Sequence, residues 1–376
     1  MGTFDKYVYE LPRRESRCGD KYASPSAHFL GTESLPGANL TMGFTVIQKE
    51  TLESFPHFHH SIEEYLMFSG PDLCNFFDFD AEIELWLGED PDEMEKYTIT
   101  KPCIIRIPAR LWHGPINYKR VGKPVAFSSV YFSGEYSRIT RRIYPDDTVD
   151  YPYIATKQEH CRIDEPLPEK YGFALEWAKQ VAAAPAAAHS GKYDKLFFEY
   201  PKEYHNYGDM YANPRGKFRG LEQMQDAHFY GGFSVVLRDS VVEVPHIHHA
   251  NDEYLWFLGS DLRNPFDFDA EIEISLGWDA DHQEVVKIDK PCVVRVPAVM
   301  WHCPIVYKTV RKPVAFFPTY YDGDWSKILR KGDGYVYEAA SLRKCSYDHE
   351  KTCFYCGKCL KDPSVPSLGV FTYKKK

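Results

Sequence analysis

The sequence has no apolar run that approaches the length needed to cross a bilayer, which excludes a membrane-spanning helix. Its first residues, MGTFDKYVYELPRRESRC, lack the apolar core of a secretory signal. Position 6 is Lys6 rather than Ser or Thr, so Gly2 does not begin a myristoylation motif. Together these absences predict a cytoplasmic protein with no membrane partner.

Basic residues are not in excess either. Lys and Arg number 45 against 54 Asp and Glu, which gives a formal net charge of −9, and the basic residues are scattered along the chain. A nucleic-acid-binding protein needs a concentrated positive surface, and no segment has the pattern of a helix-turn-helix. We therefore expect no nucleic-acid partner.

What the sequence does contain is an internal repeat. Shifted by 189 residues, the two halves of the 376-residue chain align without a gap, starting at Asp5 and Lys6 over Asp194 and Lys195. The strongest matches are Pro56–Gly70 over Pro245–Gly259, Phe77–Gly88 over Phe266–Gly277, and Lys101–Ile116 over Lys290–Ile305. Because chance similarity does not keep one register for so long, we infer a gene-level duplication.

Each half has the pattern of β structure. Short runs such as EYLMFS and CIIRIP are rich in β-branched and aromatic residues and are separated by Gly, Pro and Asp turns. The segment Pro166–Ala184 predicts a helix, and Pro185–Gly191 a linker. The expected architecture is all-β: a barrel over 1–160, a helical linker over 161–191, a second barrel over 192–340, and a Cys-rich tail over 341–376.

Histidines in matching positions of the two halves predict metal sites. On a strand, residues i and i+2 point to one face, so His57 and His59 can converge on one point, followed by Glu64 and, after a P-A-x-x-W-H turn, by His113. The matching set is His246, His248, Glu253 and His302. Three imidazoles and a carboxylate suit a divalent ion of Fe, Mn, Ni, Cu or Zn.

At these residues the sequence resembles the cupin superfamily, whose first motif has the form G-x5-H-x-H-x(3,4)-E-x6-G. The resemblance implies two small jelly-roll barrels, a bicupin, with the eight residues above as metal ligands. The match is not complete, because Thr51 and Ser240 stand at the leading Gly of the first motif. In the second motif, Arg110 and Val299 replace the turn Gly.

The acidic ligand is open to two assignments. One spacing of the motif selects Glu63 and its partner Asp252, and the other selects Glu64 and its partner Glu253. We prefer the second pair because both halves keep Glu there. The extra His60 and His249 are alternative ligands, but consecutive strand residues face opposite ways, which favours a position outside the ligand set.

Four further kinds of repeated residue are candidates. Arg106 and Arg295 can meet a substrate carboxylate, although a structural salt bridge is an equal alternative. The pocket wall can include four aromatic residues, which core packing would explain as well: Tyr65, Trp112, Tyr254 and Trp301. Cys103 and Cys292 we expect to be buried and inert.

The C-terminal tail carries a second kind of metal signal. In a cytoplasmic chain, cysteines are read as thiols or metal ligands before disulfides. The four cysteines of the tail fall within fifteen residues, and they are Cys345, Cys353, Cys356 and Cys359. Tetrahedral zinc is the leading interpretation, an iron–sulfur cluster is the alternative, and His349 can replace one thiolate.

Two functions follow from these patterns. The first is a metal-dependent enzyme acting on a small oxygen-rich or aromatic substrate chelated to the metal, as a dioxygenase or as a redox-neutral lyase, isomerase or decarboxylase. The second is a non-catalytic metal- and ligand-binding cupin that serves as a sensor or a store. Fold resemblance alone does not choose between them. A homo-oligomer is compatible with either.

Overall fold

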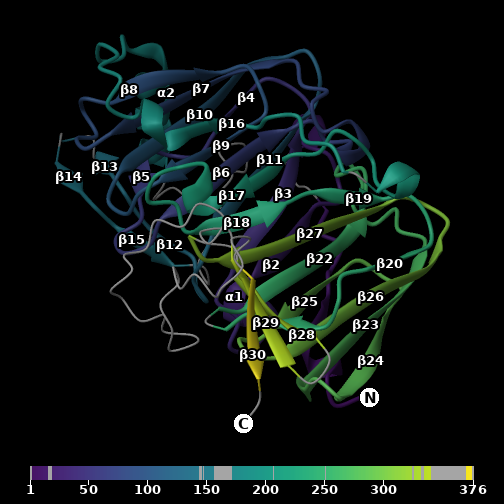
Figure 1. The fold of residues 1–376 in the computed structure, drawn as a ribbon. Helices are drawn as coiled ribbons and strands as arrows, with labels where there is room; N and C mark the ends of the chain where they lie inside the picture. The colour runs from purple at the N-terminus through teal and green to yellow at the C-terminus, as the bar shows by residue number, and fades with distance from the viewer. Residues whose placement is uncertain are drawn as a thin grey trace.

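The structure, a computed structural model, describes residues 2–15, 19–143, 146, 148–155, 172–205, 207–249, 251–323, 326–331, 334–339 and 370–374. Within these ranges the chain is built of antiparallel sheets with two short α-helices, α1 (Gly31–Ser34) and α2 (Gly172–Ala183), which confirms the predicted all-β class (Figure 1). The four tail cysteines lie outside the described residues. Neither described α-helix has the length and apolar character that crossing a membrane would need.

Barrel 1 is made of two antiparallel sheets. The first has the strand order β16 (Phe197–Glu199), β9 (Cys103–Ile107), β6 (Glu64–Ser69), β11 (Val125–Tyr131), β3 (Thr41–Ile47) and β2 (Ala27–Leu30). The second has the order β15 (Tyr153–Ala155), β12 (Ser137–Thr140), β5 (His57–Phe58), β10 (Trp112–Val121), β7 (Ala81–Gly88) and β8 (Glu95–Ile99), with β4 (Thr51–Glu53) also on β10. A separate pair joins β13 (Arg142–Ile143) to β14 (Val149–Asp150).

Barrel 2 repeats the arrangement. Its first sheet has the order β1 (Val8–Glu10), β25 (Cys292–Val296), β22 (Glu253–Gly259), β27 (Val314–Tyr321), β18 (Phe229–Gly232) and β17 (Lys217–Arg219), with β19 (Ser234–Val236) on β27. The second has the order β24 (His282–Ile288), β23 (Ala270–Asp279), β26 (Trp301–Val310), β21 (His246–Ile247), β28 (Ser326–Lys331), β29 (Gly334–Ala339) and β30 (Val370–Lys374), with β20 (Ser240–Val242) on β26.

Short 3₁₀ helices join several of these strands. They are η1 (Asp5–Tyr7), η2 (Gly19–Lys21), η3 (Leu73–Asn75), η6 (Asp194–Leu196), η7 (Gly208–Met210) and η8 (Gly220–Glu222). Each of η1 and η6 leads directly into the first strand of its repeat, β1 and β16. The two repeats therefore match in their connections as well as in their sheets.

The first strand of each repeat lies in the other barrel. Strand β1 pairs with β25 of barrel 2, and β16 pairs with β9 of barrel 1. A strand edge left open would expose unpaired backbone groups, and the exchanged strand covers it. The boundaries predicted from the repeat, 1–160 and 192–340, therefore describe the duplication, while in space each barrel takes one strand from the other repeat.

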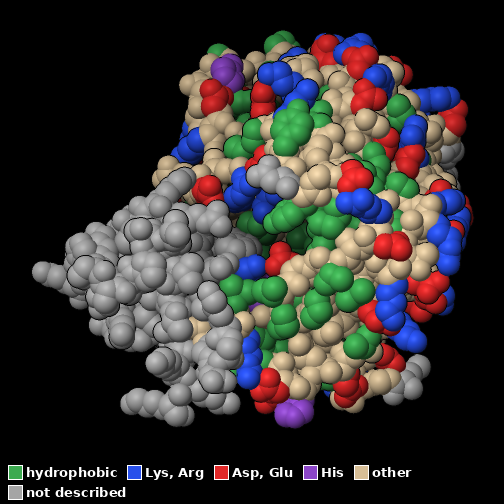
Figure 2. All heavy atoms as spheres, turned by 45° about the vertical axis from the view of Figure 1, so that its right-hand side comes forward, with side chains coloured by type: hydrophobic (Ala, Val, Ile, Leu, Met, Phe, Trp, Pro, Cys, Tyr) green, Lys and Arg blue, Asp and Glu red, His purple; other side chains and the backbone are tan. Residues whose placement is uncertain are grey.

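Apolar clusters fill each barrel and the surface between them. One apolar cluster fills barrel 1 and another fills barrel 2. A third lies between the barrels, where Phe44 contacts Trp256 and Phe317 at ring distances of 5.4 and 6.2 Å. Because each first sheet buries both of its faces, its central strands β6 and β22 read as nearly continuous apolar runs. Figure 2 shows charged side chains of both signs interspersed over the face that it draws.

Candidate metal centres

Strand pairing brings the predicted ligands of each barrel together. In barrel 1, His57 lies on β5 directly opposite His113 on β10, and Glu64 begins β6. In barrel 2, His246 lies opposite His302, and Glu253 begins β22. His59 and His248 follow directly after the ends of β5 and β21, and their side chains join the same clusters as the first His of each barrel.

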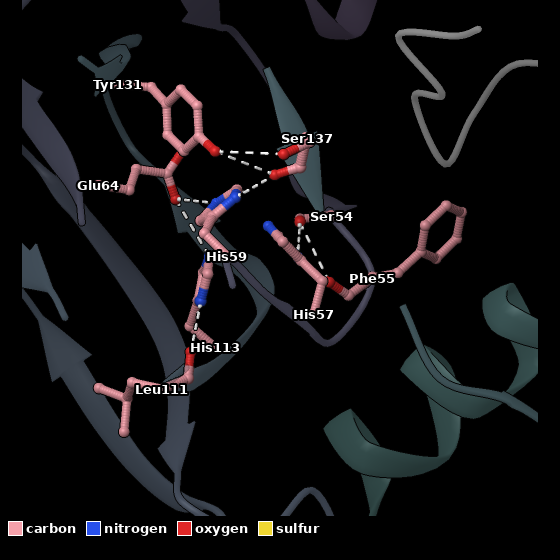
Figure 3. A network of polar contacts seen from close by, with 9 residues as sticks. All are labelled: Ser54, Phe55, His57, His59, Glu64, Leu111, His113, Tyr131 and Ser137. Carbon is pink, nitrogen blue, oxygen red and sulfur yellow. Dashed lines mark hydrogen bonds and ion pairs between the residues drawn. The ribbon is translucent and has the colours of Figure 1, made fainter. Parts of the chain in front are cut away.

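The four ligand atoms of each set form a tight, buried cluster. In both barrels one nitrogen of each His and one carboxylate oxygen all lie within 4.8 Å of one another. The carboxylate Oε2 of Glu64 is 3.2 Å from His59 Nε2 and 3.1 Å from His113 Nε2 (Figure 3). The acid in this cluster is Glu64 rather than Glu63, and its partner in barrel 2 is Glu253.

Backbone carbonyls orient the six imidazoles in a common way. Each Nδ1 lies within hydrogen-bonding distance of a carbonyl oxygen: Phe55 (2.5 Å), Ser137 (2.6 Å) and Leu111 (3.0 Å) for His57, His59 and His113, and Val244 (2.7 Å), Ser326 (2.6 Å) and Met300 (3.1 Å) for His246, His248 and His302. A carbonyl only accepts, so each Nδ1 carries the proton and each Nε2 is left with a free lone pair. This arrangement orients metal-binding histidines.

Atoms without partners show that the residues fit a cation. Within the described residues, the buried Nε2 of His57 has no hydrogen-bond partner. In barrel 2, the Nε2 atoms of His248 and His302 lie 3.4 and 3.0 Å from Glu253 Oε2, but these contacts do not form hydrogen bonds. Burial lowers the pKa of His57 well below its usual value, with help from His113 and Arg138, so the ring is neutral. Buried lone pairs that converge with a carboxylate are costly unless they share an ion. A divalent transition metal in each barrel would satisfy these atoms.

Two carboxylates and two histidines adjacent to ligands in the sequence do not belong to the metal clusters: Glu63, Asp252, His60 and His249. Glu63 accepts hydrogen bonds from Arg106 Nε (2.6 Å) and from the Tyr65 hydroxyl (2.6 Å). Asp252 accepts from Arg295 Nε (2.7 Å) and from the backbone N–H of Ala298 (3.0 Å). His60 and His249 are exposed and belong to neither cluster.

Strand alternation places four of the predicted pocket residues on the face opposite the metal ligands: Arg106, Arg295, Tyr65 and Tyr254. Tyr65 pairs with Arg106, next to the pair of Glu64 with Ile107, so the two pairs point to opposite faces. Tyr254 and Arg295 are paired in the same way beside Glu253. All four side chains point away from the metal cluster, toward the surface between the barrels, and both arginines form structural salt bridges.

Trp112 and Trp301 also lie outside the metal cavity. Each precedes the last His ligand by one residue and therefore faces the other side of its strand. Trp112 packs with Phe58 and Trp86 under α2, and Trp301 contacts Tyr335 of β29. The predicted pocket aromatics are thus replaced by others, because Tyr230 and Tyr211 line the cavity of barrel 2. Cys103 and Cys292 are buried, as expected.

A cavity of about 360 Å³ opens onto the metal ligands of barrel 2. It is lined by His246, His248, Glu253 and His302, and its other polar walls come mainly from the segment before and within β17. These walls include His205, Arg215, Lys217 and Glu243, none of which the motifs pointed to. The alignment of the halves contained the signal, since Arg215 and Lys217 stand over Ser26 and His28.

Two non-glycine residues occupy the turn position at which the second cupin motif has Gly. Arg110 and Val299 have φ of 69° and 61°, in the left-handed region. Their backbone N–H groups donate to the carbonyls of His59 (2.7 Å) and His248 (2.8 Å). The turn therefore fixes the backbone of a metal ligand in each barrel. A β-branched residue such as Val299 is strained in this conformation.

Comparisons with known proteins agree with the fold. No family model matches the chain, and no curated protein matches it in sequence. Among solved structures, a Bacillus subtilis oxalate decarboxylase with Mn(II) centres superposes with a TM-score of 0.51 at 11% identity, over 88% of this chain and 80% of that one. Another oxalate decarboxylase structure gives 0.51 at 11% identity, over 100% and 90%. At this identity the likeness concerns the fold. The chain has the bicupin fold, with a metal-ligand set in each barrel.

Proposed function

We propose that the chain is a metal-dependent bicupin enzyme that acts on a small oxygen-rich organic substrate bound in the cavity of barrel 2. The observation that carries the proposal is that all four ligands of this barrel line a cavity that also holds non-ligand polar groups. The three imidazoles and the carboxylate would hold a divalent transition-metal ion at the cavity wall, where substrate oxygens could reach it. A divalent ion held there would supply Lewis-acid polarisation of those oxygens.

The protein's own groups would orient the substrate and handle protons. The cavity volume lies at the lower end of the range for small-molecule sites, so it suits a compact ligand. Apart from Glu253, the carboxylate among the described lining residues is Glu243, which forms an ion pair with Lys327 (Glu243 Oε2 to Lys327 Nζ, 2.9 Å). We assign proton transfer at the substrate to this carboxylate, which lies beside the ligand cluster without belonging to it.

Redox-neutral chemistry on an organic acid is the reaction class to test first. The structural neighbours are oxalate decarboxylases, and one has Mn(II) centres. Decarboxylation, isomerisation or carbon–carbon cleavage needs metal polarisation and a proton donor, both of which the cavity of barrel 2 can provide. Dioxygenase chemistry on the same substrate is the second candidate, since the three imidazoles and the carboxylate would also suit a redox-active ion such as Fe.

The test is conversion of a panel of small carboxylic, hydroxy and enolic acids, oxalate included, by full-length protein loaded anaerobically with Mn(II) or Fe(II) and followed by NMR. We expect one acid to be converted under argon, and conversion to be lost in metal-free protein. Conversion only with dioxygen uptake would assign an oxygenase. Saturable binding of acids without conversion under either gas would contradict the enzyme and leave the metal-dependent binding protein.

A further inference from the structure

At three positions in its first sheet and just before it, barrel 2 carries a Lys or Arg where barrel 1 carries neither. Strand β17 and the residue two before it place Arg215, Lys217 and Arg219 at alternate positions, on one face. The shift of 189 residues sets these three over Ser26, His28 and Leu30 of barrel 1. The side chains at these three matched positions therefore differ although the metal ligands are the same.

Sheet register places Lys217 on the same face of the sheet as the metal ligand Glu253, three strands away. One row across the first sheet of barrel 2 runs through Glu253, Tyr320, Tyr230 and Arg219. On the same face, two residues further along these strands, Leu255 pairs with Pro318 and Gly232 pairs with Lys217. Gly232 makes room for the lysine, since a Cβ there would come within 2.9 Å of Lys217 Cγ. Lys217 thus shares a face and a cavity with the ligand Glu253.

The cations of this face differ in how far they are already neutralised. Arg219 donates two hydrogen bonds to the Glu203 carboxylate, at 2.5 and 2.6 Å. The ion-pair distance between Arg215 and the same carboxylate is longer, at 3.7 Å. Arg215 donates one hydrogen bond to Ser234 Oγ (3.2 Å), while its Nε is buried without a partner. Within the described residues Lys217 makes no ion pair or hydrogen bond, and its ammonium lies over the Tyr230 ring at 5.0 Å.

An unpaired cation in such a cavity favours an anion. Burial and the neighbouring Arg215 and Arg219 lower the pKa of Lys217 to about 7. A carboxylate in the cavity would offset this repulsion and make charge-assisted hydrogen bonds with Lys217 and Arg215. The lining carboxylates do not fulfil this role, because Glu253 belongs to the metal cluster and Glu243 is paired with Lys327.

We propose that Lys217 and Arg215 form an anion-binding subsite in barrel 2, and that the substrate is an organic acid with one carboxylate there and a second oxygen-bearing group on the metal. This proposal rests on the proposed function and specifies its substrate class. Lys217 and Arg215 are binding residues that select the substrate by its remote charge, and barrel 1 has no counterpart to them at the matched positions.

Two hydroxamates of similar size test the subsite on metal-loaded, full-length protein. N-hydroxysuccinamic acid carries a metal-chelating hydroxamate and a remote carboxylate, and butyrohydroxamic acid carries a methyl group in place of the carboxylate. By calorimetry we expect the first to bind at least about 10-fold more tightly, as a charge-assisted hydrogen bond would give. The ratio should fall several-fold in Lys217→Met, in which Arg215 remains, and recover in Lys217→Arg.

Matched controls separate the possible failures. Butyrohydroxamic acid should bind Lys217→Met with wild-type affinity, which shows that fold and metal are retained. His28→Met, at the same position of barrel 1, should leave the ratio unchanged. If neither hydroxamate binds the wild type, the open metal site and the proposed function are wrong. If both bind equally well, the metal site stands and the anion subsite is refuted.

Discussion

The two barrels share a metal-binding design and differ in what surrounds it. Each holds three imidazoles whose Nδ1 atoms face backbone carbonyls, and each adds a Glu at the start of a central strand. Barrel 2 adds Arg215 and Lys217 to a cavity on its ligands, where barrel 1 has Ser26 and His28. The two halves thus keep the same ligand residues and differ in residues that line the cavity of barrel 2, to which we assign the choice of substrate charge.

The largest difference between the barrels should appear when one metal ligand is removed from each. We expect His302→Ala and His113→Ala each to lower the metal content by one ion per chain, since each removes one ligand of one cluster. Binding of N-hydroxysuccinamic acid should fall at least about 100-fold in His302→Ala only, because the metal supplies most of the chelate energy. Equal loss in both variants would contradict the assignment of the ligand site to barrel 2.

The second comparison concerns the surface between the barrels. The Tyr65 hydroxyl donates to the buried carboxylate of Glu63, whereas the Tyr254 hydroxyl donates to the neutral amide oxygen of Asn39, in both cases at 2.6 Å. Tyr65→Phe should lower the free energy of unfolding by about 2 to 3 kcal/mol and Tyr254→Phe by about 1 kcal/mol. Urea denaturation measures both losses of unfolding free energy. A larger loss for Tyr254→Phe than for Tyr65→Phe would contradict the view that the buried Glu63 carboxylate depends more strongly on its hydrogen bond than the Asn39 amide does.

A third comparison uses the left-handed turns. Val299 and Arg110 both have positive φ, and a β-branched side chain is the less tolerant of that conformation. Replacement by Gly should raise the free energy of unfolding by about 1 kcal/mol at Val299, and by less at Arg110. Thermal unfolding of the two variants side by side tests this. A destabilised Val299→Gly would mean that the exposed valine is held by contacts stronger than the backbone strain.

The smallest effect is a pH dependence of anion binding. Lys217 has a pKa of about 7, set by burial and by Arg215 and Arg219 against the opposing charges of Glu203 and Glu243. Its ammonium is present below that pH and lost above it, so the affinity for N-hydroxysuccinamic acid should fall several-fold as the pH rises from 6 to 8. Lys217→Arg stays charged across this range and should show a flatter profile for the same probe. Butyrohydroxamic acid corrects both profiles for metal-centred effects.

The metal ligands could be predicted from the sequence because their spacing is local and repeated. The two-residue period of a strand predicts that His57 and His59 face the same side, and Glu64 follows only a few residues later in the sequence. The same alternation predicts that Tyr65, one residue after the ligand Glu64, faces away from the cluster, and so does its strand partner Arg106. Both were nevertheless pocket candidates because they lie close to the ligands in the sequence. Alternation, rather than distance along the chain, decides which neighbours of a ligand share its cavity.

Two features needed the three-dimensional structure. Strands β1 and β16 each pair with the other repeat rather than with their own. Because the two repeats have matching sequences, the sequence alone does not distinguish these two pairings. Lys217 lies far from the histidines in sequence and reaches the cavity through three strand pairings, from β22 through β27 and β18 to β17. The sequence-based prediction of a thiolate metal site at Cys345, Cys353, Cys356 and Cys359 stays a prediction, since these residues lie outside the described ranges.

The most direct test of the difference between the barrels is a crystal structure of Mn(II)-loaded protein soaked with N-hydroxysuccinamic acid, with anomalous scattering used to locate the metal. We predict one manganese peak within each ligand set, and the acid in barrel 2 with its carboxylate against Lys217 and Arg215. Manganese in both barrels with the acid bound in barrel 1 alone, or with its carboxylate turned away from Lys217, would contradict this account.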